Sequence, residues 1–171
     1  MREINDIVKE INEKITVDAK FYQLATLQTK DGKTFPAINT GNGQGEKISP
    51  ENSLQIYHRI LDSETETDTN LGKGKFPYQN RIYTMKLVGI GNMRKVSGSY
   101  DTNDKIKNEV FDQIPQVLSG KEIIIPGDEN IIREDVLGAE FDGINLDKLR
   151  LDLIAFSIEY EIKQRICPTR N

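Results

Sequence analysis

A glycine-rich segment in the first third of the chain has the composition of a phosphate-binding loop. Gly41, Gly43 and Gly45 are separated by single residues, and such loops bind phosphate through backbone amides that point at the ligand. That geometry also needs a helix directly after the loop, whereas the residues after Gly45 have no helical periodicity. The segment therefore predicts a flexible turn, and nucleotide binding at Gly41 to Gly45 stays an alternative.

The single histidine, His58, is the other residue that could act in catalysis. It lies in phase with Ile56 and Ile60 in a segment of alternating apolar residues, which favours a packed side chain with one hydrogen bond. A general base would instead need a nucleophile or a substrate group within reach. A small nucleotide-handling or hydrolytic enzyme that uses His58 and the glycine segment is therefore the alternative hypothesis for this chain.

The numbers of histidine and cysteine residues limit the chemistry further. With one histidine and one cysteine, Cys167, the chain has neither a paired-histidine metal site nor a cysteine zinc cluster, and it cannot form an intramolecular disulfide. Cys167 has no Cys-x-x-Cys partner, so we expect an inert thiol. The sequence thus predicts no catalytic residue, no cofactor-binding residue and no metal ligand.

Alternating carboxylates in the middle of the chain resemble the first ligands of a calcium-binding loop: Asp62, Glu64, Glu66 and Asp68. Such a loop also needs a central glycine and a bidentate carboxylate at its twelfth position, where this sequence has Thr67 and Lys73. We therefore expect a solvated acidic loop over about residues 61–79. Because this segment has few apolar residues to bury, we expect it to become ordered only against a neighbouring chain.

Charge and composition argue against several classes of protein. The 171 residues are 36% hydrophobic and 29% charged, and this length predicts one domain, residues 1–171. The net charge of −4 argues against nucleic acid as the main partner, although basic residues near Phe76 and Tyr78 have the composition of a single-strand binding surface. No apolar run approaches the ~20 residues of a membrane span, and the first residues do not form a signal peptide.

The first elements predicted from the sequence are an amphipathic helix and a hairpin. Isoleucine and valine recur at steps of three and four over residues 3–15, which indicates a helix that lies on a sheet or on a neighbouring subunit. Strands over residues 21–29 and 34–39 flank Asp31 and Gly32, a pair that favours a type I′ turn.

Since Pro36 has no amide to donate, we expect its strand to lie at an edge or to begin late. A peptide-binding adaptor could add a strand at such an edge.

The second half of the chain combines strands with one further helix. Alternating apolar residues predict strands over residues 54–60 and 81–91. A helix is predicted over residues 104–118, and Pro115 should bend its last turn. After it, isoleucine runs on both sides of residues 126–130 predict another hairpin.

The last strand, over residues 151–163, has the most regular alternation in the sequence. Its length of about 13 residues is more than twice the usual 5–6, so it should reach beyond the rest of the domain. Strands joined by short turns pair in antiparallel fashion. The predicted fold class is therefore α+β, with a mainly antiparallel sheet covered by two helices and the long inserted loop at about residues 61–79.

The order of these elements resembles that of the tail-terminator and tail-completion proteins of tailed bacteriophages. The resemblance rests on the first helix, the hairpin with residues 34–38, the long loop, the strand over residues 81–87, the second helix and the long closing strand. Proteins of that family form rings at the neck or at the top of the tail, and their adjacent subunits assemble through sheet edges and loops.

The resemblance implies a virion structural protein without enzymatic activity. It would be a ring-forming subunit of the phage neck or tail, with a terminator, completion or head–tail connector role. Its partners would be copies of itself and other neck, portal or tail proteins, and neither sequence-specific nucleic acid nor a membrane. The protein would be assembled in the host cytoplasm and would reside in the virion. Because the match is one of architecture, it assigns no site residue and no cofactor.

Overall fold

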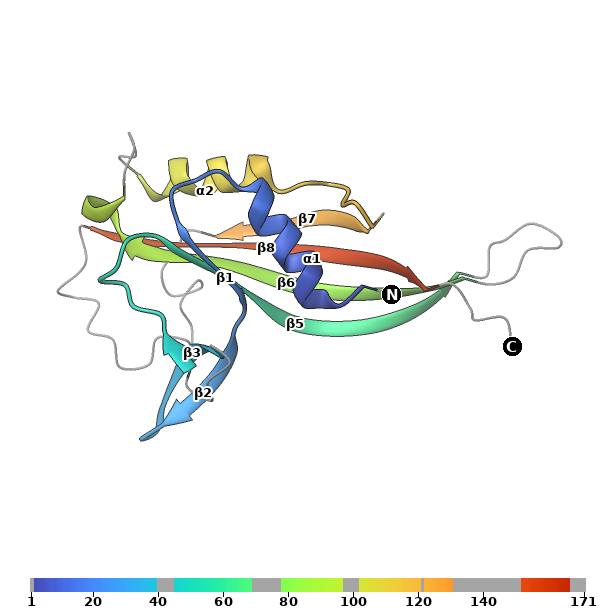
Figure 1. Ribbon diagram of the computed structural model, residues 1–171, viewed down its shortest axis with the longest axis horizontal. Helices are drawn as coiled ribbons and strands as arrows, with labels where there is room; N and C mark the ends of the chain where they lie inside the picture. The colour runs from blue at the N-terminus through green and yellow to red at the C-terminus, as the bar shows by residue number, and fades with distance from the viewer. Residues whose placement is uncertain are drawn as a thin grey trace.

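The computed structural model describes residues 2–39, 45–68, 78–96, 102–120, 122–130 and 152–166. Within these residues the fold contains helices and two separate β-sheets (Figure 1). The fold class is α+β, as the sequence predicts. The helices are α1 (Ile4–Lys14), the short 3-10 helix η1 (Met93–Lys95) and α2 (Asn103–Gln113).

The larger sheet has five strands in the order β1-β5-β6-β8-β7. β1 pairs with β5 in parallel, and the other neighbouring strands pair in antiparallel fashion, so the sheet is mostly antiparallel as predicted. The longest ladder joins β6 to β8, from Gln79–Ile166 to Asn92–Leu153, without a register shift. The strands are β1 (Lys20–Leu24), β5 (Gln55–Asp68), β6 (Tyr78–Asn92), β7 (Ile123–Asn130) and β8 (Leu153–Ile166).

Three of these strands continue past the first turn of α1 and converge at one end of the molecule (Figure 1). We call this extension the arm; it consists of residues 62–68 of β5, 78–84 of β6 and 161–166 of β8. The predicted closing strand is thus confirmed and runs three residues further, to Ile166. Because β8 is this long, it pairs with β6 both in the arm and in the rest of the sheet, and so connects the two.

The smaller sheet contains β2 (Thr26–Lys30), β3 (Lys33–Asn39) and β4 (Gly45–Lys47) in sequence order. The turn between β2 and β3 has positive φ at Asp31 (54°) and Gly32 (72°), which confirms the type I′ turn. β3 is the middle strand, so the expectation of an edge strand there was wrong. Pro36 pairs with Leu27 of β2 but precedes Ala37, where pairing with β4 begins, and its missing amide is therefore tolerated.

The predicted strand over residues 21–29 is divided at Ala25 between the two sheets. The Ala25 amide donates to the carbonyl oxygen of His58 at 2.9 Å, and the next residue already pairs with β3. Ala25 is buried, so a small side chain suits the point where the chain crosses from one sheet to the other. The apolar pattern continues through this crossing, which is why the sequence suggests one strand.

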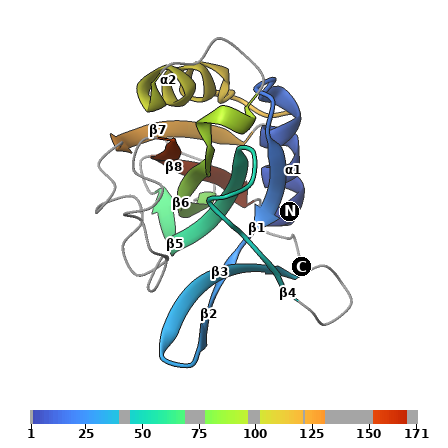
Figure 2. The same cartoon turned by 90° about the vertical axis from the view of Figure 1, so that its left-hand side faces the viewer.

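Two apolar cores lie on opposite faces of the larger sheet, with the helices on one side and the smaller sheet on the other (Figure 2). Ile7, Val8 and Ile11 of α1 pack with Ile106 and Val110 of α2 in the first core. The second core joins side chains of both sheets, including Tyr22, Ile48, Tyr57, Val88, Ile90 and Ala155. Strands β6 and β8 are therefore buried on both faces where the two cores overlap.

Helix α2 is shorter than predicted. Thr102 caps it by accepting a hydrogen bond from the Lys105 amide at 3.3 Å, and it ends at Gln113 instead of residue 118. Ile114 has an extended backbone, since the residue before a proline is disfavoured in the helical region. The residues after Pro115 follow the outer edge of β7, where the Ile124 amide donates to the Gln116 carbonyl at 2.8 Å.

The predicted loop over about residues 61–79 is wrong where the structure describes it. Residues 62–68 pair with residues 78–84 in a continuous ladder between β5 and β6; residues 69–77 lie outside the described residues. The side chains of residues 62–67 are exposed, so these positions need no apolar residue and show no apolar alternation. Backbone pairing with β6, rather than burial, holds this segment in the sheet.

The hairpin predicted around residues 126–130 is also wrong. Ile123–Asn130 is one strand, and its register with β8 shifts between Pro126 and Glu129. Gly127 and Asp128 form a bulge opposite Glu159, directly after the paired Pro126, at the edge of the sheet, where proline and glycine are tolerated. The isoleucines at 131 and 132 lie outside the described residues.

A prediction follows from the packing of Gly89 against Phe156, its partner across β6 and β8. A Cβ atom at position 89 would overlap the Phe156 ring. We expect Gly89→Ala to lower the free energy of unfolding by about 1–3 kcal/mol, because the ring must move. In the background of Phe156→Leu the same change should cost clearly less. Urea unfolding of both single variants and the double variant measures this coupling, and strictly additive effects would contradict it.

Candidate functional site

His58 lies in the core between the helices and the larger sheet, and it is fully buried. Its Nδ1 atom is 2.7 Å from the Tyr160 hydroxyl of β8, and its Nε2 atom is 2.7 Å from Oδ1 of Asn12 in α1. The prediction of a packed histidine was therefore correct, with two hydrogen bonds instead of one. His58 does not line the cavity beside β7 that is described below.

The donor and acceptor in each hydrogen bond around His58 are fixed by the bond that Asn12 makes to Tyr22. Asn12 donates from Nδ2 to the carbonyl oxygen of Tyr22 at 2.8 Å, so its Oδ1 faces His58 and can only accept. The imidazole must then donate from Nε2, and its unprotonated Nδ1 accepts from the Tyr160 hydroxyl. This relay joins α1, β1, β5 and β8 and requires the neutral form of His58.

Burial shifts the pKa values of His58 and Tyr160, the two titratable side chains of this relay. Desolvation lowers the pKa of His58 from 6.5 to about 3 and raises the pKa of the Tyr160 hydroxyl. His58 is thus uncharged at neutral pH, with both ring nitrogens engaged. Within this structure the side chain supports the packing of α1 on the sheet.

The other sequence-predicted candidates are not brought together with His58. Gly45 opens β4, whereas Gly41, Gly43 and Cys167 lie outside the described residues. The carboxylates of Asp62, Glu64 and Glu66 lie along a strand, and the described residues contain no group of three His, Cys, Asp or Glu side chains that could hold a metal ion. No described helix has the length and apolar character needed to cross a membrane.

A second polar cluster joins the start of α1 to the segment before β7. Arg2 contacts Glu10 at 2.8 Å and the buried Glu122 at 3.0 Å. Ser119 donates to the Glu10 carboxylate from its hydroxyl at 2.6 Å and from its backbone amide at 2.8 Å. These bonds, together with Arg2, lower the pKa of Glu10 to about 2. Its groups are mutually paired, so the cluster fastens the chain near the N-terminus.

The exposed large hydrophobic side chains of the described residues lie on the two sides of the larger sheet, at β7 and at the part of β5 that follows the end of its pairing with β1 at His58. Ile60 and Leu61, which are 40% and 43% exposed, form what we call the β5 patch. Ile123 and Ile125 of β7, together with Val117, which bridges to Ile123, form the β7 patch. Solvent-exposed apolar groups that gather at particular places mark contact surfaces.

The two patches lie at the same height along the strands. Ile60 pairs with Met85, Met85 with Tyr160, and Tyr160 with Pro126, which follows Ile125. This row runs across the sheet from Ile60 of the β5 patch to Pro126, the neighbour of Ile125 in the β7 patch. A copy placed beside this one in the same orientation would bring the β5 patch of one to the height of the β7 patch of the other, with Ile60 and Pro126 on the helix face of the sheet and Ile125 on the opposite face.

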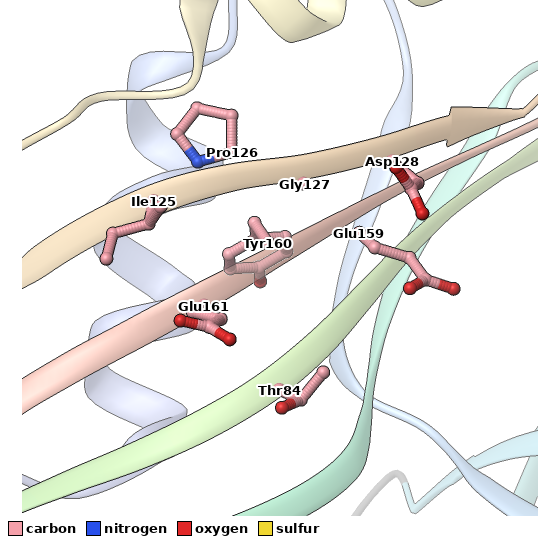
Figure 3. Close-up of a pocket in the computed structure, with 8 residues that line it drawn as sticks. All are labelled: Thr84, Ile125, Pro126, Gly127, Asp128, Glu159, Tyr160 and Glu161. Carbon is pink, nitrogen blue, oxygen red and sulfur yellow. The ribbon is translucent and has the colours of Figure 1, made fainter.

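A cavity of about 270 Å³ lies beside the β7 patch (Figure 3). The bulge in β7 opens it, and Gly127 suits the bulge because a Cβ there would lie 3.0 Å from the carbonyl oxygen of Glu159. The carboxylates of Asp128 and Glu159 extend toward the same side (Figure 3). The lining residues are Thr84, Ile125, Pro126, Gly127, Asp128, Glu159, Tyr160 and Glu161.

Sequence reasoning missed both patches and the acidic cavity. The isoleucine pattern predicts one strand of a hairpin at Ile123 and Ile125, although their i, i+2 spacing already places them on one face of a strand. Nothing in the sequence indicates that Asp128 and Glu159 meet, because the bulge that brings them together depends on pairing between β7 and β8. Comparison of the chain with known protein families and with curated proteins finds no match.

The buried relay predicts a specific pH dependence of stability. The unfolded chain binds a proton at His58 near pH 6.5, whereas the folded chain does not until about pH 3. The stability is therefore complete above pH 6.5 and decreases by about 1.4 kcal/mol per pH unit as the pH falls through this window. Urea unfolding from pH 7 to pH 5 should show this slope.

His58→Gln is the matched control for that measurement. Glutamine does not titrate, but it can donate to Asn12 and accept from Tyr160. Because His58 is the only histidine, this variant should lose the slope between pH 6.5 and pH 5. An unchanged slope in the variant would show that another group controls the pH dependence.

Proposed function

We propose that this protein is a structural subunit without enzymatic activity, which forms a ring with copies of itself in the neck or tail of a tailed bacteriophage. The observation that carries the proposal is the position of the β5 and β7 patches at opposite edges of one sheet and at one height. The order of elements, which resembles the tail-terminator and tail-completion proteins, gives the proposed place of the ring.

The two patches favour head-to-tail association. They consist of different residues on different strands, so the contact between two copies would use one patch from each. A contact of this heterologous kind leaves one patch open at each end of a pair, and further copies join until the rotation closes a ring.

Pairing of two copies through the β5 edge alone is disfavoured. Asp62, Glu64 and Glu66 alternate along this strand in the arm, and an antiparallel copy would place their charges opposite one another. Charged edge strands of this kind limit unwanted pairing between sheets. The acidic arm therefore supports contact through the patches, and it leaves the arm for other neck, portal or tail proteins.

The apolar patches supply only part of the free energy that association needs. Complete burial of one large apolar side chain stabilises by about 1.5–3 kcal/mol, and Ile60, Leu61, Ile123 and Ile125 are already about half covered. Fixing one copy relative to another costs about 4–15 kcal/mol. The interface therefore needs polar pairs beside the two patches.

Native mass spectrometry and negative-stain electron microscopy of the purified protein at several concentrations test the proposal. We expect subunits that associate as the concentration rises and closed rings in the images. A protein that remains monomeric at every concentration would contradict the proposal.

A mixing experiment tests the head-to-tail arrangement. Ile60→Glu changes only the β5 patch and Ile125→Glu only the β7 patch, and each variant alone should be monomeric because a buried unpaired carboxylate is costly. An equimolar mixture should form dimers and nothing larger, because only one intact pair of patches is available. Ile125→Val, which stays apolar, should assemble like the unmodified protein. A mixture that remains monomeric would contradict head-to-tail contact.

A further inference from the structure

We infer that the acidic cavity beside the β7 bulge receives the guanidinium group of Arg59 from the neighbouring copy in the ring. This inference rests on the proposed function, because it needs a second copy placed edge to edge. It assigns a specific polar contact to the interface, next to the two apolar patches.

The ladder places Arg59 and the cavity on the same face of the sheet and at the same height. Arg59 pairs with Lys86, and Lys86 pairs with Glu159. Side chains of directly paired residues lie on one face of a sheet. On β7, Tyr160 pairs with Pro126 and Ile158 with Glu129, so Glu159 lies opposite the bulge residues Gly127 and Asp128. One row therefore has Arg59 at one edge and Asp128 at the other.

The next row of the sheet also brings matching residues together. Toward the arm, Arg59 is followed by Ile60, and the bulge residues Asp128 and Gly127 are followed by Pro126, because β7 runs opposite to β5. Ile60 and Pro126 belong to one row of paired residues, on the face of the sheet opposite to Arg59. A copy moved sideways without inversion thus places a cation against carboxylates on one face and the exposed Ile60 against the exposed Pro126 on the other. Both contacts need the same displacement, and this is why a second copy is a better occupant than an unrelated basic protein.

The chemistry of the cavity suits an arginine side chain. Asp128, Glu159 and Glu161 make no hydrogen bond or ion pair with the other described residues, so their carboxylates are available to a partner. A guanidinium group can donate to two carboxylates at once in a fixed planar geometry. Ile125 and Pro126 line one wall of the cavity, against which the methylene part of the side chain can pack.

Charge reversal tests this pairing by sedimentation velocity and native mass spectrometry. Arg59→Glu and Asp128→Arg should each raise the dissociation constant of assembly by about 10- to 100-fold. The double variant with both changes should assemble more tightly than either single variant, since the two charges have exchanged places. Arg94→Glu, which makes the same charge change in η1, should leave assembly within about threefold of the unmodified protein.

The outcomes separate this inference from the proposed function. If the unmodified protein does not assemble, the proposed function fails and the inference fails with it. If the protein assembles and the single variants assemble equally well, or if the double variant is no better than the single variants, only the Arg59 contact is overturned. Circular dichroism identifies variants that do not fold, and for those the pair Arg59→Gln and Asp128→Asn gives the same test through its coupling energy.

Discussion

The ladder between β6 and β8 is the constraint on which the rest of the structure depends. It runs without a register shift, and odd-numbered residues of β6 such as Met85 and Leu87 face the helices while Val88 and Ile90 face the smaller sheet. A slip of one residue would move each set of side chains into the other core and disrupt the packing of both cores. Helices, smaller sheet and edge strands therefore all take their positions from this one register.

The buried histidine relay and the two edge patches are parts of the same arrangement. Tyr160, which donates to His58 in the interior, lies in the row that ends at Ile60 on one edge and at Pro126 on the other. Because the relay fixes α1 against β5 and β8, the edges are held in place by a rigid core. An interface that is ordered before contact loses less conformational entropy on association.

The sequence predicts an element correctly where its apolar periodicity or turn chemistry matches its burial. It is misleading where backbone pairing with another strand is the only cause of the structure. The first helix, the Asp31–Gly32 turn and the closing strand have strong periodicity or turn chemistry, and the structure confirms them. The side chains of residues 62–67 are exposed and several are acidic, so only the ladder of this segment with β6 makes it a strand. The relay partner of His58 is Asn12, 46 residues away, and no local pattern could identify it.

The β5 segment of the arm differs from the body of the sheet in how much packing supports it. The side chains of residues 62–67 are exposed, whereas Ile82 and Ile162 of the other two arm strands are buried, and β5 is itself buried further along. Regions with few buried apolar contacts open at a lower free energy than the whole domain. The outer part of the arm can therefore exchange its amide hydrogens and adapt its shape while the body remains folded. The subunit thus combines rigid sides with an adaptable end, and a partner at that end can be accommodated without repacking either core.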